Sequence, residues 1–95
     1  MFAVSGMWKM DPSMRAQQEQ MLPHLVQGVK QNPGFVRGFW ANDLGEPDQS
    51  VTFIVFETLA QARDFRDAVL KNAPAQVVSG VERGGLRIVE VKADG

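Results

Sequence analysis

Four side chains of this 95-residue chain have the chemistry to bind or activate a small molecule, namely His24, Arg37, Trp40 and Asn42. His24 is the only histidine, and as a general base it needs a pKa near the working pH and a substrate facing it. Arg37 could stabilise a phenolate or a developing oxyanion by its charge. Trp40 could stack on an aromatic ring, and Asn42 shares its side of a continuing strand because side chains alternate with a period of two.

Each of these residues also has a purely structural interpretation. His24 lies between apolar neighbours in a predicted helix, where it could be a capping or surface group. Trp40, like Trp8, could pack in the core or in an interface. Arg37 could form a salt bridge at a sheet edge, and so could Arg87 on the last predicted strand. The residue types alone therefore leave both interpretations open.

The composition excludes several other chemistries. There is no cysteine, which excludes disulfide bonds, thiolate catalysis and cysteine-ligated zinc. A single histidine builds no metal site without further ligands. The acidic residues of segment 42–49 match no calcium-loop spacing. We therefore expect neither a metal nor another cofactor.

The net charge and the hydropathy pattern limit the kinds of partner that the protein could bind. The net charge of −1 argues against a surface that binds nucleic acid. No segment approaches the roughly 20 apolar residues of a membrane span. The N-terminal MFAVSGMWKM has neither a basic flank nor a long apolar core, so no signal peptide is predicted. We expect a cytoplasmic protein with no nucleic-acid or membrane partner.

The first half of the chain reads as a strand over 2–9 followed by a long helix. Asp11-Pro12 predicts the helix start, since aspartate is a good N-cap and proline is tolerated in the first turn. Pro23 predicts a kink or a break. Asn32-Pro33-Gly34 ends the helix. The apolar stripe expected to be buried consists of Met14, Met21, Leu22, Leu25, Val26 and Val29.

The second half repeats this alternation of strands and helix. Thr58 and Gln61 predict a capping box that opens a second helix over 59–73. Gly84-Gly85 predicts a turn. The remaining predicted elements are a strand over 35–41, a hairpin loop over 42–49, a strand over 51–57 and a last strand over 86–92.

The order β-α-β, β-α-β predicts a single domain over 1–95 with a ferredoxin-like α+β sandwich fold. Four antiparallel strands would form the sheet, with both helices on one face. The other face would be apolar as well. In the third strand Val51, Phe53 and Val55 alternate with Thr52, Ile54 and Phe56, and in 35–40 bulky residues also fall on both sides. We therefore expect a homodimer that packs sheet on sheet; the alternative is a monomer whose twisted sheet hides part of this face.

The pattern resembles the dimeric α/β-barrel superfamily, and within it the antibiotic-biosynthesis-monooxygenase-like (ABM) domains. The resemblance rests on PGF at 33–35, within NPGFVRGFW, and on VFET at 55–58, where a strand runs directly into a helix. It implies two protomers whose sheets form a barrel, with a small-molecule pocket between sheet and helices. Several members oxidise electron-rich phenolic or polycyclic compounds with O₂, without metal or flavin.

Other members of the superfamily bind and degrade haem. That branch uses an asparagine on the first strand, a tryptophan late in the third strand and a histidine on the second helix. In this chain the first two positions fall at about Met7 and Phe56, and segment 59–73 contains no histidine. The resemblance therefore does not extend to haem degradation. Two functions remain open: a cofactor-independent monooxygenase acting on a small aromatic compound, or a non-catalytic homodimer that binds a small hydrophobic ligand or acts through its assembly.

Overall fold

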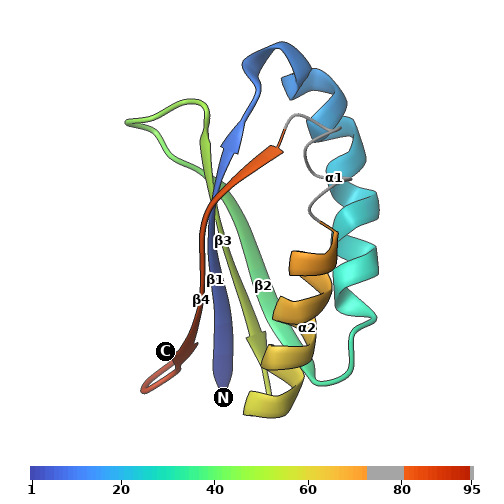
Figure 1. The fold of residues 1–95 in the computed structure, drawn as a ribbon, viewed down its shortest axis with the longest axis vertical. Helices are drawn as coiled ribbons and strands as arrows, with labels where there is room; N and C mark the ends of the chain where they lie inside the picture. The colour runs from blue at the N-terminus through green and yellow to red at the C-terminus, as the bar shows by residue number, and fades with distance from the viewer. Residues whose placement is uncertain (73–80, 95) are drawn as a thin grey trace.

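The computed structural model describes residues 1–72 and 81–94, with 81–84 described by their backbone only. The elements are β1 (Phe2–Met10), the 3₁₀ turn η1 (Pro12–Met14), α1 (Arg15–Lys30), β2 (Phe35–Asn42), β3 (Gln49–Phe56), α2 (Leu59–Lys71) and β4 (Val81–Glu90). The strands form one antiparallel sheet in the order β2-β3-β1-β4. Both helices cover the same face of it (Figure 1). This arrangement confirms the predicted ferredoxin-like α+β fold.

The start of the first helical segment is where the sequence places it, but it has a different form. The carboxylate of Asp11 accepts a 3.0 Å hydrogen bond from the Ser13 N–H, and Pro12 occupies the first turn. These residues cap a 3₁₀ turn, and the α-helix begins only at Arg15. The helix then continues through Pro23 to Lys30 without the predicted break. Pro23 is exposed, on a part of the helix where no buried residue depends on its geometry.

The second helix begins as predicted. The Gln61 N–H donates to the Thr58 hydroxyl at 3.2 Å, and the Thr58 N–H donates to Gln61 Oε1 at 3.2 Å, which completes the capping box. The same glutamine lies against Gly34, which turns the chain into β2 with φ +79°; a Cβ there would lie 1.8 Å from Gln61 Oε1. The glycine of the PGF segment therefore packs against the capping box. Any other residue at position 34 would have an unfavourable positive φ and would clash with the Gln61 side chain. The predicted final residues of this helix, from Ala73 onward, lie outside the described residues.

The sheet contains two irregularities that the alternating pattern did not predict. The register of β4 shifts where Met7 pairs with Gly85 and Trp8 with Arg83, which leaves Gly84 as an extra residue. Gly84-Gly85 is therefore a bulge inside a strand and not a turn, because a β-bulge absorbs one unpaired residue and lets the strand continue.

A second register shift, at Val36, changes which residues of β2 share a face. Phe35 pairs with Phe56, whereas Arg37 pairs with Val55. Strict alternation would put the side chains of Phe35 and Arg37 on the same face of the sheet. Because of the bulge, Phe35 instead packs edge-on against Phe56, with ring centroids 6.4 Å apart, while Arg37 faces away from the helices.

The hydrophobic core lies between the sheet and the helices. Its buried members are Val4, Val29, Ile54, Phe56 and Ala62. The expected burial of the whole α1 stripe is wrong for the described structure: Val29 joins the core near the C-terminal end of α1, whereas Met21 and Leu25 stay 54% and 53% exposed. Only the end of α1 that approaches β2 contributes to the core.

No helix in the described part of the chain is long and apolar enough to cross a membrane. The cytoplasmic location stays a prediction.

The helix-free face is partly covered by the chain's own C-terminal segment, residues 91–94. The Val91 N–H donates to the Met1 carbonyl at 3.0 Å, and Asp94 lies 4.0 Å from Arg37 on β2. Since β4 and β2 are opposite edges of the sheet, the segment crosses the face between them. The rest of the face stays apolar and open, as the alternation in β3 predicts.

Candidate functional site

Trp8 lies on the helix-facing side of β1, folded back along its own strand. Its indole Nε1 donates a 2.9 Å hydrogen bond to Thr52 Oγ1 on β3. The ring passes over Gly6, where a Cβ would lie 2.7 Å from Nε1. The missing side chain at Gly6 therefore gives the indole the room that brings it to the threonine hydroxyl.

Trp40 repeats this arrangement on β2. A Cβ on Gly38 would lie 2.9 Å from the Trp40 ring and 3.0 Å from Ile54 Cδ1. Trp40 pairs with Thr52 across the sheet, and Thr52 pairs with Gly6. Thr52 is therefore flanked by two strands that each carry a folded-back tryptophan: Trp8 is hydrogen-bonded to its hydroxyl, and Trp40 is its cross-strand partner, with a ring that lies beside Ile54.

Asn42 lies one step further along the same face. Asn42 pairs with Ser50, which pairs with Trp8. The Ser50 hydroxyl and Asn42 Oδ1 are 2.9 Å apart, with the hydroxyl donating. The structure therefore brings Trp40 and Asn42 together, as their spacing predicts. We call the group formed by Trp8, Trp40, Asn42, Ser50 and Thr52 the indole site.

The indole site offers ring faces and neutral hydrogen-bonding groups. Indole faces stack on planar aromatic rings. Hydroxyl and amide groups both donate and accept hydrogen bonds, so they can orient a phenolic oxygen. None of the five side chains is ionised at neutral pH. These side chains have the chemistry to orient an aromatic molecule, but proton transfer would have to involve that molecule itself or water.

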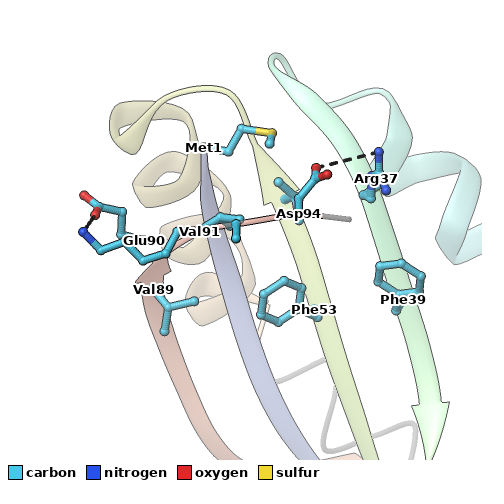
Figure 2. Close-up of a pocket in the computed structure, with 11 residues that line it drawn as sticks. Met1, Arg37, Phe39, Phe53, Val89, Glu90, Val91 and Asp94 are labelled. Atoms are coloured by element: carbon cyan, nitrogen blue, oxygen red, sulfur yellow. Dashed lines mark ion pairs between the residues drawn. The ribbon is translucent and has the colours of Figure 1, made fainter.

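Arg37 lies on the opposite face of the sheet from Trp40. It lines a shallow groove of about 450 Å³ at the end of the helix-free face, and Figure 2 shows it beside Asp94, Phe39 and Phe53 in front of the strands. Arg37 and Trp40 therefore cannot line one pocket within a single chain. The grouping of Arg37, Trp40 and Asn42 around one substrate is not what the fold produces.

His24 is exposed on α1 and stands apart from the indole site. No described hydrogen bond or ion pair joins it to Trp8, Trp40 or Asn42. Its placement matches the surface interpretation more closely than that of a general base. Among the described residues no group of three or more His, Asp or Glu side chains could hold a metal ion.

The sequence interpretation missed Thr52 and did not include Trp8 among the candidate site residues. A signal for both was present in the spacing. Gly6-Met7-Trp8 and Gly38-Phe39-Trp40 each place a glycine two residues before a tryptophan, on the same face of a strand. A bare strand surface beside a large ring predicts that the ring lies along the strand.

No protein-family model matches the sequence, and no curated protein sequence matches it. Solved structures do match the fold. A proposed antibiotic biosynthesis monooxygenase from Deinococcus radiodurans is 20% identical, with a TM-score of 0.73 and coverage of 100% of this chain and 94% of that one. SnoaB, a cofactor-independent oxygenase from Streptomyces nogalater, is 14% identical over 98% of this chain and 94% of its own, with a TM-score of 0.73.

The haem-degrading protein MhuD of Mycobacterium tuberculosis, solved with two haems in its active site, also shares the fold. It is 13% identical over 100% of this chain and 99% of its own, with a TM-score of 0.77. These similarities confirm that the chain shares the fold of these ABM-type structures. In this chain the two positions that the haem-degrading branch would use lie apart: Met7 is on the helix-free face, 47% exposed, and Phe56 is fully buried in the core.

Proposed function

We propose that the protein is a cofactor-independent monooxygenase that oxidises a small electron-rich aromatic compound with O₂. The observation that carries the proposal is that two indoles, Trp8 and Trp40, lie on the same face of the sheet, with Trp8 hydrogen-bonded to the Thr52 hydroxyl and Trp40 paired with Thr52 across the strands. The ABM-type fold supports the reaction class, since SnoaB, which shares it, is a cofactor-independent oxygenase.

In this reaction the substrate supplies the electrons. An ionised anthrone-type compound reduces O₂ directly: one oxygen atom replaces two hydrogens as a carbonyl, and the other leaves as water with two protons. The chain's own contribution is to bind and orient. The indoles stack on the ring, and the Thr52 hydroxyl hydrogen-bonds a phenolic oxygen. Holding the ring in one pose lowers the barrier by orientation alone, without a titrating side chain.

Oxygen uptake with a panel of anthrones and hydroquinones tests the proposal. We expect at least one compound to react faster than in buffer. Trp40→Phe and Trp8→Phe should each lower that rate by about tenfold, the effect expected when positioning is weakened. Arg63→Ala, on the exposed surface of α2, is the matched control and should leave it unchanged. The proposal fails if no compound reacts faster than in buffer, or if both tryptophan variants match the parent.

A non-catalytic homodimer that binds a small hydrophobic ligand is the second candidate. The lack of ionisable groups in the indole site favours this candidate, because such a site can bind a ligand without catalysing a reaction. Binding of a non-oxidisable aromatic compound, followed by quenching of tryptophan fluorescence, would support this candidate where no oxygen is consumed.

We also propose that the protein is a homodimer in either case. Its helix-free face exposes Phe39, Met7 and Val89 by 58%, 47% and 37%. Burying apolar surface of this kind stabilises association by roughly 25 cal/mol per Å² before the entropy of association is subtracted. Light scattering behind size exclusion should give a mass near twice 10.5 kDa. A mass of one chain would contradict the dimer.

A further inference from the structure

The loop between β2 and β3, residues 43–48, carries the most exposed large apolar side chain of the described structure. Leu44 is 99% exposed. Figure 1 shows the loop projecting from the sheet on the side opposite the helices. We call this loop the arm. A partner that packs on the helix-free face would therefore also contact the arm.

The arm is held in place by hydrogen bonds at both its ends and within its turn. Asp43 Oδ1 accepts from the N–H groups of Gly45 and Glu46, at 2.7 and 3.2 Å. The Asp48 carbonyl accepts from the Met10 N–H at 2.6 Å, and the Pro47 carbonyl accepts from the Arg15 guanidinium. These contacts preorganise the arm, so presenting Leu44 to a partner costs little additional conformational entropy.

The groove lies at the other end of the same face. Phe39, Phe53, Val55 and Val89 form its apolar floor, and the segment 91–94 closes one side. The distance from the arm to the groove is roughly the length of β1, about 26 Å for eight steps of 3.3 Å. One face therefore presents a protruding leucine at one end and an apolar groove at the other.

Charged side chains lie at both features, but the groove does not present a basic surface to the arm. The arm carries three carboxylates, Asp43, Glu46 and Asp48, and no basic residue. The groove is lined by two cations, Arg37 and Lys92, and also by the two carboxylates that pair with them, Asp94 and Glu90. An arm entering this groove would therefore gain mainly apolar burial, and its carboxylates could pair with either cation only in competition with these partners.

A second copy of the chain is the partner that this pattern fits. In a twofold dimer every contact occurs twice, with residue i of one copy touching residue j of the other and the reverse. A twofold axis perpendicular to the strands turns one sheet end for end over the other. We infer that in the dimer the arm of each copy inserts Leu44 into the groove of its partner, between Phe39, Phe53 and Val89. This inference rests on the proposed homodimer.

The available area favours this use of the arm. Four strands about 4.8 Å apart and eight residues long outline a flat face on the order of 500 Å². A stable interface buries about 800 Å² on each partner. The flat outline of the sheet face is therefore smaller than this area, and two arms supply further contact area at both ends of the interface.

Cysteine pairs test the inference directly, because the natural chain contains no cysteine. In the Leu44→Cys, Val89→Cys double variant we expect mild oxidation to give a covalent dimer as the main band on a non-reducing gel. Within one chain the two positions lie toward opposite ends of the sheet, whereas a disulfide needs Cα atoms about 4.4–6.8 Å apart, so the bond must join two copies. Neither single variant should cross-link. Leu44→Cys with Leu70→Cys, on the helix side, is the matched control and should stay uncross-linked.

The outcomes separate this inference from the dimer itself. A parent dimer by light scattering with no cross-link in the double variant overturns the arm contact and leaves the dimer proposal standing. Cross-linking by Leu44→Cys alone also overturns it, because the two arms would then meet each other. A monomeric parent overturns both proposals. In support, Leu44→Ser should raise the dimer dissociation constant about tenfold, the loss typical of an interface anchor.

Discussion

The indole of Trp8 is tied to Thr52 by a 2.9 Å hydrogen bond between neighbouring strands, and it reaches that hydroxyl by lying over Gly6. This relationship links a spacing in the sequence to the geometry of the indole site. A glycine two residues before the tryptophan removes the side chain that would hold the ring off the sheet. The ring then fills that space and finds a partner for its N–H group.

Thr52→Val should destabilise the protein, because valine keeps the shape of threonine but leaves the Trp8 N–H without its acceptor. The expected loss in the free energy of unfolding is about 1 kcal/mol, since a net hydrogen bond contributes roughly 0.5–1.5 kcal/mol. Urea unfolding monitored by tryptophan fluorescence measures it. Thr52→Ser keeps the hydroxyl and should retain most of the hydrogen-bond contribution. Equal stability of the valine variant and the parent would show that the bond contributes nothing.

Alanine at the two site glycines should also destabilise the fold. The added methyl group would lie 2.7 Å from Trp8 at Gly6→Ala and 2.9 Å from Trp40 at Gly38→Ala, so each ring has to move. Overpacking of this kind costs about 1–3 kcal/mol. Thermal unfolding of both variants checks the prediction.

Gly28→Ala provides the matched control with the opposite sign. Gly28 lies inside α1, where a Cβ meets nothing within 4 Å. Alanine in an exposed helix interior stabilises by up to about 1 kcal/mol relative to glycine. The interpretation of the indole site is wrong if Gly6→Ala and Gly38→Ala unfold at or above the temperature of Gly28→Ala.

Much of the fold follows from local patterns in the sequence. The alternation of Val51, Phe53 and Val55 with Thr52 and its neighbours predicts a strand with two apolar faces, and β3 has them. The capping box at Thr58 and the helix stop before Gly34 depend on contacts a few residues apart, which a sequence displays directly.

Most differences between the predicted and the observed structure arise from features that leave no clear local signal in the sequence. The bulge at Val36 inserts one residue at a position where no residue type signals it, whereas the bulge at Gly84 falls in a glycine pair that is equally typical of a turn. The bulge at Val36 separates Phe35 from Arg37. The crossing of segment 91–94 over the helix-free face depends on its contacts with β1 and β2, far away in the sequence. For the same reason the indole site was predicted only in part: period-two spacing joins Trp40 to Asn42, but pairing Thr52 with both indoles requires the strand order.

Ser13→Ala should raise the pKa of Asp11. The Ser13 hydroxyl and then the Ser13 backbone N–H donate hydrogen bonds to this carboxylate and lower its pKa below the ordinary value of 3.8. Because the folded pKa is the lower one, ionised Asp11 favours the folded state above the ordinary pKa, and this contribution is lost as the pH falls through the folded value. An NMR titration of the Asp11 carboxyl carbon measures the shift.

The variant should move the pKa of Asp11 part of the way toward 3.8, since the backbone N–H remains. Ser50→Ala, near the start of β3, removes a hydroxyl elsewhere and should leave the titration of Asp11 unchanged. An unchanged Asp11 pKa in Ser13→Ala would mean that the hydroxyl does not interact with the carboxylate in solution.

Phe39→Asp should convert the proposed dimer into a monomer. Phe39 is 58% exposed and lines the groove on the helix-free face, so an aspartate there is tolerated by a single chain. In a sheet-to-sheet dimer the same carboxylate would be buried without a compensating charge, which costs several kcal/mol. Light scattering should then show a mass near 10.5 kDa. Leu25→Asp places the same charge on the exposed surface of α1, where the residue is 53% exposed, and should leave the dimer intact. A dimer that survives Phe39→Asp and dissociates with Leu25→Asp would move the interface from the sheet to the helices.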